Sequence, residues 1–494
     1  TRLPRAIRDV YKRQVLNIAY NYVITVAKSK PYNIQMKAIL NEFNNKSIDI
    51  NSYIKTFENF NNNNEAFICK DFVYKNNLAT YRKFYIVSPS LYLYYTYQTF
   101  ELYFDIIKKN NIFNYSHIDI FYSGIVNEDF KAIKENCDFN NQYEEYKNKQ
   151  AEYKNNYVLI TDIANFFDSI NVDALLSKCN SLVFSYRGKD AINNLKGLFM
   201  GFNIASLPQL HYSIASSLLS QIYLVDITRE ADQLLQQNNW SGVRFVDDFC
   251  INLNKKFTYK DINKFLHEYS NLLYKENLNL NLSKTKRLTP KNFEKLISTN
   301  KDKSSYDENI KSIEEYLNLK KGKYSVNDSI KKKANSLLED AGNEFMNFIV
   351  EVKKIYKRYG LDIKRYNKKV DKYFSINKED SSKVIKHFIF NQEWKKEISE
   401  IDLKTIIECK ELIYFDPMNF TILYCLIHSY LNISKNSHFD QFNNFYDAPL
   451  RNLMIFEQLT IQGFVSKQEF HKVKNSFQEI DKNAALFFEK YIFK

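Results

Sequence analysis

A chain of 494 residues with 45% hydrophobic and 26% charged residues has the composition of a globular protein with room for more than one domain. Only nine glycines and seven prolines are present, and no GxGxxG or GxxxxGK[ST] pattern occurs, which excludes a Rossmann or P-loop enzyme. The formal net charge of +13 favours a polyanionic partner such as nucleic acid, although a solvated lysine-rich surface explains the same surplus.

The chain carries no sign of secretion or of membrane insertion. Its six cysteines are scattered without the spacing of zinc ligands, and they predict reduced thiols in a cytoplasmic protein. No apolar run approaches the roughly 18 residues of a membrane span, so we expect no membrane contact. Residues 1–14 resemble the translated end of a transposon used in sequencing libraries, and we exclude them from the fold prediction as a non-native segment.

The pattern of apolar residues changes twice along the chain. Residues 15–110 predict mixed helix and loop, and residues 111–155 are polar with helical patches. From residue 157 to about 287, short β-type runs alternate with helical stretches, which predicts an α+β sheet with crossover helices. After Pro290 only helices are expected, and the basic surplus is concentrated between Lys284 and Lys372.

Acidic residues interrupt or follow apolar runs at two places. The run Val158–Ile160 predicts a buried strand that leads to Asp162, where a carboxylate is costly unless it is solvated, paired or bound to a metal. Asp168 and Ser169 could instead simply cap the next helix. Farther along, Asp247 and Asp248 lie between two apolar runs and predict a hairpin with acids at its turn, or else an ordinary exposed turn.

Paired acids on neighbouring strands suit one kind of chemistry. Phosphoryl transfer to a hydroxyl uses two hard cations roughly 3.5–4 Å apart, one at the attacking oxygen and one at the leaving pyrophosphate. Mg²⁺ prefers oxygen ligands and keeps several waters, so two or three carboxylates suffice to hold it. Asp162 on one strand and Asp247 with Asp248 on a neighbouring hairpin would provide them.

Four elements in this order resemble the palm of a reverse transcriptase. The first two are the strand Asp with an aromatic residue five positions later and the aromatic-x-Asp-Asp hairpin. The others are a Leu-Pro-Gln element before a Ser-rich helix and a Leu-Asn-x-x-Lys-Thr element. In this chain they are Asp162 with Phe167, Phe245–Asp248, Leu207–Gln209 with Ser213–Ser220, and Leu280–Thr285.

The resemblance implies a role for each matching residue. Asp162, Asp247 and Asp248 would hold Mg²⁺ or Mn²⁺, and Lys284 would be the general acid for pyrophosphate, unless it is a solvated lysine. Phe167 would exclude a 2′-hydroxyl and so select dNTPs, unless it is a core aromatic like Phe166. The remaining substrate contacts are expected at Ile163, at Gln209 beside the base pair, and at Arg82, Lys83 and Lys75 on the triphosphate.

In the residues of its motifs and in its helical C-terminal part, the chain resembles the bacterial abortive-infection and other defence-associated reverse transcriptases. The resemblance implies a right-hand polymerase with fingers over residues 15–155, a ferredoxin-like palm over 156–289 and an all-α, thumb-like domain over 290–494. It also implies antiphage defence, homo-oligomers, and DNA synthesis that is in some members untemplated and primed on a protein tyrosine. Nucleic acid partners would be product DNA or a non-coding RNA.

One departure bears on the type of synthesis. The family usually has Gly after Leu-Pro-Gln, whereas this chain has Leu210, whose side chain would crowd the nascent base pair. We therefore expect short, biased or untemplated products. The alternatives are a conventional RNA-directed DNA polymerase of retron or intron type, a non-catalytic nucleic-acid-binding scaffold, and a palm-fold nucleotide cyclase.

Overall fold

The computed structural model describes the chain in nine segments, which fall into two compact units that we describe separately. The segments are residues 5–30, 33–43, 66–74, 81–107, 112–122, 139–254, 257–301, 453–461 and 465–493. The first unit takes the described residues within 1–30, 38–69 and 85–302, and the second takes those within 31–37, 70–84 and 303–494. Lys75 and most of the expected C-terminal domain lie outside the described residues.

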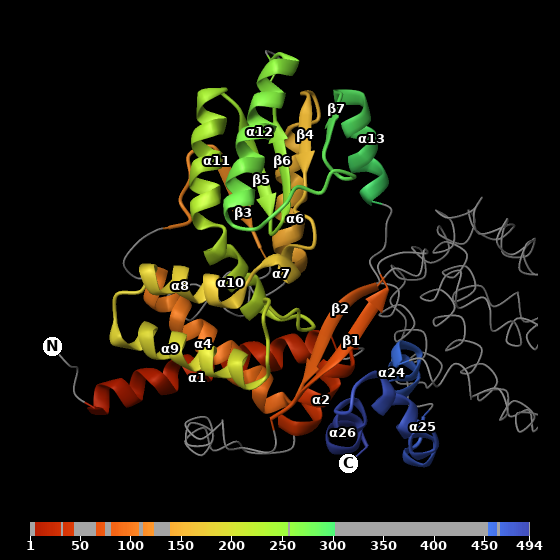
Figure 1. Ribbon diagram of the computed structural model, residues 1–494. Helices are drawn as coiled ribbons and strands as arrows, with labels where there is room; N and C mark the ends of the chain where they lie inside the picture. Colours follow the sequence, from red (N-terminus) through yellow and green to blue (C-terminus); the bar gives the residue numbers. More distant parts are fainter. Residues whose placement is uncertain are drawn as a thin grey trace, which may run out of the picture. The chain divides into compact units, whose positions relative to one another are not determined.

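A mixed five-stranded sheet is the centre of the first unit (Figure 1). Its order is β3-β5-β6-β4-β7, with β3 parallel to β5 and every other neighbouring pair antiparallel. Without β3, the strands and the helices between them follow the βαββαβ order that is described as ferredoxin-like. The strands are β3 (Ile118–Phe121), β4 (Val158–Thr161), β5 (Ser241–Phe245), β6 (Asp248–Asn252) and β7 (Lys286–Leu288).

Helices cover both faces of this sheet. On one face lie α11 (Val225–Gln237) and α12 (Tyr259–Lys275), and on the other α6 (Phe139–Glu152) packs on β3 and β5. The helix α12 begins in a capping box between Thr258 and Asp261. Gly242 is required where α11 meets β5, because a Cβ there would lie 2.6 Å from the ring of Phe249.

A helical layer forms the rest of the first unit. Its centre is α4 (Pro89–Ile107), which is buried along nearly its whole length. The helices α1 (Arg5–Ser29) and α9 (Tyr186–Gly201) pack against α4, and α8 (Val172–Leu182) and α10 (Ile214–Tyr223) complete the layer. The backbone amides of Phe184 and Ser185, just before α9, donate to Asp105 of α4, and Arg187 pairs with Glu101.

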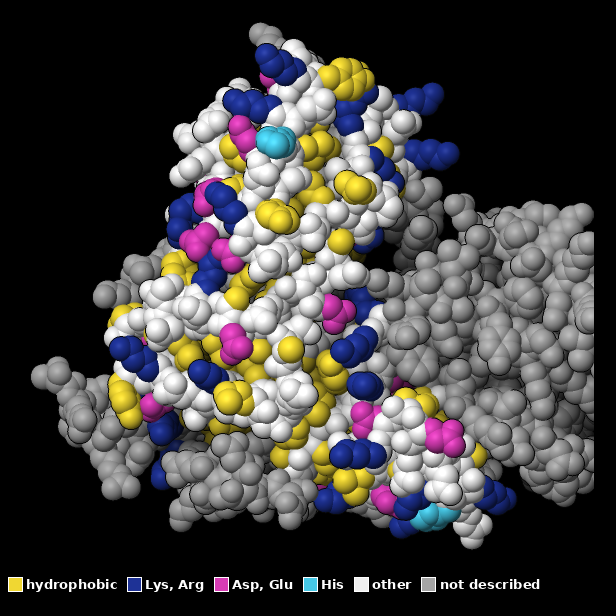
Figure 2. All heavy atoms as spheres, viewed as in Figure 1, with side chains coloured by type: hydrophobic (Ala, Val, Ile, Leu, Met, Phe, Trp, Pro, Cys, Tyr) yellow, Lys and Arg dark blue, Asp and Glu magenta, His cyan; other side chains and the backbone are white. Residues whose placement is uncertain are grey.

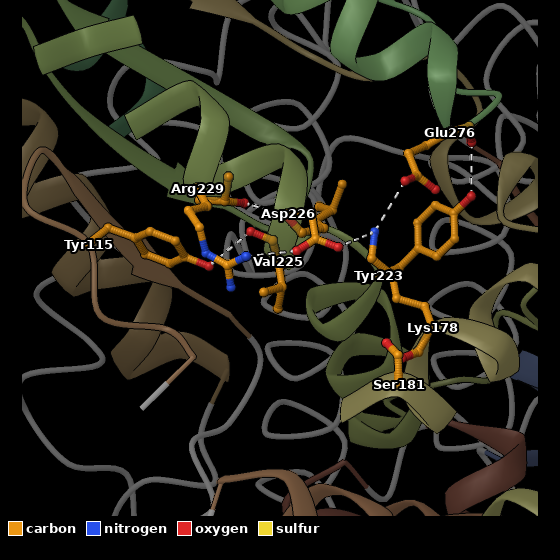
Figure 3. A network of polar contacts seen from close by, with 10 residues as sticks. Tyr115, Lys178, Ser181, Tyr223, Val225, Asp226, Arg229 and Glu276 are labelled. Atoms are coloured by element: carbon orange, nitrogen blue, oxygen red, sulfur yellow. Dashed lines mark hydrogen bonds and ion pairs between the residues drawn. The ribbon is translucent and has the colours of Figure 1, made fainter. Parts of the chain in front are cut away.

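Lys178 links the helical layer to the helices on the sheet (Figure 3). Its side chain is 11% exposed, and its ammonium lies 3.2 Å from Asp226 at the start of α11 and 3.3 Å from Glu276 after α12. The same ammonium lies over the ring of Tyr223, whose hydroxyl donates to the Glu276 carbonyl. One lysine of α8 thus contacts both helices that cover the sheet.

The second unit combines short segments from the first hundred residues with the C-terminal helices. It contains the start of α2 (Ile34–Phe43), parts of the two-stranded sheet of β1 (Ile68–Tyr74) and β2 (Tyr81–Val87), and the C-terminal helices. These are α24 (Leu453–Ile461), α25 (Lys467–Ile480), α26 (Ala484–Phe487) and a π-helical turn at Phe488–Ile492. Phe456 lies at the centre of an aromatic cluster with the rings of Phe470, Phe477, Phe488 and Phe493.

Polar contacts attach the C-terminal helices of this unit to its N-terminal part. Lys37 donates to the carbonyls of Thr460 and Ile461, the last residues of α24, at 3.1 and 3.3 Å. The backbone amide of Lys70 on β1 donates to Asp481 after α25. A cation at the carboxyl end of a helix stabilises it through the helix dipole.

The structure differs from the sequence-based prediction at several elements. The strands β1, β2 and β3 lie where mixed helix, loop and polar sequence were expected. Neither Asp168 nor Ser169 caps the next long helix, because Asn171 accepts the first amides of α8. The helix α1 begins at Arg5, inside the segment excluded as non-native. None of the described helices is long and apolar enough to cross a membrane.

Candidate active site

The strand registers bring the predicted acids together at one end of the sheet. The β4–β6 ladder pairs Thr161 with Phe249, so the next pair outward is Asp162 with Asp248. The β4–β7 ladder reaches the pair of Ile160 with Lys286, and beyond it the Lys284 side chain extends to the Asp162 carboxylate. Residues directly opposite each other on neighbouring strands point to the same face of a sheet. Asp162 therefore lies between an acid and a lysine.

Asp162 is held by two polar side chains from the segment before β7. It is 3% exposed, and its Oδ2 accepts from Asn281 Nδ2 at 2.8 Å and lies 3.1 Å from Lys284 Nζ. The Asn281 backbone amide also donates to the Asp162 carbonyl, at 2.7 Å. Lys284 is an exposed lysine, as the alternative expected, and its ammonium is paired with a buried carboxylate.

Lys284 carries a positive charge at neutral pH. Burial alone would lower the pKa of Lys284, but the hydrogen bond and the charge of Asp162 outweigh it and raise the pKa above its ordinary value. The ammonium is therefore in the acid form that proton donation requires. The pairing with Asp162 also makes the Lys284 ammonium a weaker acid. A cation that neutralises the Asp162 carboxylate would remove this effect.

The environment of Asp248 opposes the ionisation of this carboxyl group. Burial, followed by the charges of Asp247 and Asp162, raises the pKa of Asp248 to about 7. Asp247 and Asp248 are half-buried at the hairpin turn, so they share this end of the sheet with Asp162. Three crowded oxygen donors of this kind suit a hard divalent cation, which would relieve the repulsion.

The acids are neighbours, but their side chains are not yet arranged as a complete metal-binding site. Across the residues described, no three His, Cys, Asp or Glu side chains are already arranged to hold a metal ion. The Lys284 ammonium and the Asn281 amide occupy Asp162 Oδ2 in this structure. The chemistry of the donor set thus fits Mg²⁺ or Mn²⁺, and binding would require the carboxylates to turn toward the ion.

The hairpin turn that carries Asp247 is tight and closely packed. β5 and β6 are joined by only Val246 and Asp247, and Val246 has a φ of 54°. That backbone region is costly for a β-branched residue. Behind the turn, the ring of Phe245 lies 5.6 Å from the ring of Tyr146, which is 3% exposed. The surrounding structure therefore imposes this conformation on the turn.

The structure also locates the substrate-contact residues of the first unit. Ile163 is 2% exposed and forms a β-bridge with Leu280, so its side chain is a core group and only its backbone could meet a substrate. Phe167 is half-buried with its ring 5.3 Å from the ring of Phe166, which is 3% exposed and is the core aromatic expected. Gln209 is half-buried, and its carbonyl accepts from the amide of Tyr85 at 2.8 Å.

Leu210 does not present its side chain to open space. It is 6% exposed and forms a bridge with Tyr85. The Leu210 side chain is therefore largely enclosed by the protein, which weakens the steric reason for expecting untemplated synthesis.

The residues predicted to contact the triphosphate lie in the second unit or outside the described residues. Arg82 and Lys83 are exposed residues of β2 in the second unit. Lys75 is not among the residues that the structure describes. The role of these three residues stays a prediction.

A basic edge lies beside the acids. Exposed lysines lie along β7, the segment before it and α13 (Pro290–Lys301). Figure 2 shows Lys and Arg side chains projecting from this part of the surface. They include Lys284, Lys286, Lys291 and Lys295. The Arg287 guanidinium lies 4.5 Å from the ring centroid of the exposed Tyr259. Such a surface suits a polyanion.

Sequence reasoning did not assign two polar residues of the site. Asn281 lies inside the Leu280–Thr285 element, but nothing in the sequence shows that its amide reaches Asp162. Arg244 lies three residues before Asp247 and is 4% exposed. The signal that could have identified Arg244 was a charged residue within an otherwise apolar strand run.

No protein-family model matches this chain, and no curated protein sequence matches it significantly. Its activity therefore has to be inferred from its own residues.

Proposed function

We propose that this protein is a DNA polymerase of the reverse-transcriptase type, which adds dNTPs to a growing strand by phosphoryl transfer with Mg²⁺ or Mn²⁺. The observation that carries the proposal is the strand register. It brings Asp162 beside Asp248, with Asp247 at the adjoining turn, and the Lys284 side chain reaches Asp162 from the segment before β7. The βαββαβ order of the sheet supports it, because a ferredoxin-like sheet is what the resemblance predicts for the palm.

Each polar residue at this end of the sheet has a role in the proposal. Asp162, Asp247 and Asp248 would hold the cations, which supply Lewis acidity to the phosphoryl group. Asn281 fixes the direction of the Asp162 carboxylate through its hydrogen bond. Lys284, protonated at neutral pH, would donate its proton to the departing pyrophosphate once the cations neutralise Asp162. Phe167 would reject the ribose 2′-hydroxyl.

The wider role follows from the resemblance to defence-associated reverse transcriptases. We propose that the protein acts in antiphage, abortive-infection defence in the cytoplasm, as a homo-oligomer. The basic edge along β7 and α13 would hold product DNA or a non-coding RNA through its phosphates.

The test uses purified full-length protein, Mg²⁺ or Mn²⁺ and labelled dNTPs, with and without a primed RNA. We expect labelled DNA from the native protein and from Asp168→Asn, whose acid is exposed and lies six residues after Asp162. Asp247→Asn should yield none. Equal product from Asp247→Asn would exclude this metal site, and incorporation of ribonucleotides at the same rate would exclude the role of Phe167.

A conventional RNA-templated enzyme is the second candidate, and the burial of Leu210 favours it. The same reactions separate the two types of synthesis. Product that copies a supplied RNA indicates the conventional type. Product that forms without template, and that changes mobility after protease treatment, indicates untemplated, protein-primed synthesis.

A further inference from the structure

Arg244 is a buried cation directly behind the acidic turn. It lies on β5, is 4% exposed, and donates from Nη2 to Gln221 Oε1 at 3.0 Å and from Nη1 to the Val246 carbonyl at 3.3 Å. Its Nε has no hydrogen-bond partner. None of the acidic side chains in the described segments forms an ion pair with it. A charged guanidinium is therefore buried with only neutral acceptors.

Such an arrangement is unfavourable for stability alone. Removing an ion from water costs several kcal/mol unless an opposite charge offsets it. Burial lowers the pKa of Arg244, while Tyr269, Tyr115 and Asp247 act against that shift. The two tyrosines are neutral at pH 7, because burial raises the pKa of Tyr269 to about 12 and also raises that of Tyr115. Asp247 is then the negative charge that Arg244 compensates.

Arg244 also holds the backbone of the turn. The Val246 amide donates to Phe121 of β3 at 3.3 Å, and the Val246 carbonyl accepts from Arg244. Both polar groups of this strained residue are therefore tied to the sheet. The Val246 carbonyl belongs to the peptide that leads into Asp247, so its direction sets the direction in which the Asp247 side chain leaves the turn.

We infer that Arg244 is a positioning residue for the acidic site: by holding the Val246 carbonyl, it aims the Asp247 carboxylate at the cation. Gln221 in turn fixes the guanidinium from α10. This inference rests on the proposed metal-dependent function and adds a residue that acts on the site from the opposite, buried face of the sheet.

The first test replaces Arg244 with Gln and measures Mn²⁺ affinity by electron paramagnetic resonance of the free ion. We expect a loss of roughly 10–100-fold in affinity and in kcat, as for residues that orient metal ligands, with the KM for dNTP unchanged. Arg244→Lys, which keeps the charge, should recover part of the affinity. Arg229→Gln, at an exposed arginine of α11, is the matched control and should bind Mn²⁺ like the native protein.

A metal-free measurement checks the turn itself. Amide hydrogen exchange at Val246 and Asp247 should become faster in Arg244→Gln and stay unchanged in Arg229→Gln. Slow exchange at both amides in Arg244→Gln, together with native Mn²⁺ affinity, would overturn the inference.

A second variant separates positioning from simple stabilisation and serves if Arg244→Gln does not fold. Gln221→Glu gives the guanidinium a carboxylate partner and should draw it from the Val246 carbonyl and from Asp247. We expect lower Mn²⁺ affinity with no loss in melting temperature. Native affinity in this variant would show that Arg244 is only structural. If the native protein binds Mn²⁺ but makes no DNA, the proposed function fails while the inference about the site stands.

Discussion

Two pairs of neighbouring acids in this protein have opposite environments. At the end of the sheet, Asp162 and Asp248 lie beside an ammonium ion and are joined by half-buried Asp247. In the second unit, Asp71 and Glu457 are 3% and 6% exposed, and Glu457 Oε1 has no hydrogen-bond partner. Burial, and then the charge of Asp71, raises the pKa of Glu457 well above its ordinary value. Crowded acids that partly reach solvent can bind a metal ion. Burial instead favours the protonated form of an acid, as at Glu457, which forms with Asp71 what we call the sealed pair.

The largest expected effect comes from neutralising one acid at each place: Asp247, which adjoins the first pair, and Glu457 of the second pair. Asp247→Asn should reduce polymerisation roughly a thousandfold or more, because a metal contact to the phosphoryl group is worth several kcal/mol. Glu457→Gln should leave the rate within about twofold, since Glu457 has no role in the proposed metal site. Initial rates of dNTP incorporation measure both, and equal losses in the two variants would remove the distinction between the pairs.

Metal binding should also raise the thermal stability of the protein. Saturating Mg²⁺ or Mn²⁺ should raise the melting temperature of the native protein by a few degrees, because a ligand that binds only the folded state stabilises it. Asp247→Asn should lose most of this rise, and Asp168→Asn should keep it. Calorimetry with and without the ion is the measurement. The same rise in Asp247→Asn would locate the bound ion elsewhere.

The sealed pair should make stability fall with rising pH. Glu457 holds its proton more tightly when folded, so its contribution is complete below the ordinary pKa of 4.5 and is lost as pH rises toward the folded-state value. The melting temperature of Glu457→Gln should therefore exceed that of the native protein by more at about pH 8 than at about pH 5. A constant difference across this range would mean that Glu457 titrates normally.

The smallest expected effect concerns the attachment of α24. Lys37→Met removes the cation from the last carbonyls of this helix and should cost about 1 kcal/mol. Faster amide exchange in its final turn, measured by mass spectrometry, would show the loss. Lys472→Met, at an exposed lysine of α25, is the control, and equal exchange in the two variants would mean that Lys37 contributes nothing.

The two acid pairs also differ in how much of their surroundings could be predicted from the sequence. The strand before Asp162 and the hairpin at Asp247 could be predicted, because β-type apolar runs flank both acids and the hairpin is local. The contact between the Lys284 side chain and Asp162 could be seen only in the folded sheet. The hydrogen bond from Asn281 to Asp162 spans 119 residues and leaves no periodic signal.

The second unit had no local pattern to reveal it. Its contacts join residues 423 positions apart between Lys37 and Thr460, and 411 apart between Lys70 and Asp481. The strands β1 and β2 were missed because lysine, arginine and tyrosine interrupt the alternation that marks a half-buried strand. The strand β3 is only four residues long and pairs with β5, which follows more than a hundred residues later.

The edge strand β7 has a consequence for the behaviour of the protein at high concentration. It spans only Lys286–Leu288 and pairs with β4 on one side, so its other side offers a few free backbone groups to a strand from another molecule. Its length and the exposed Lys286 make that pairing unfavourable, since short, charged edges resist strand addition. The lysines that suit this edge to nucleic acid therefore also protect the sheet from aggregation.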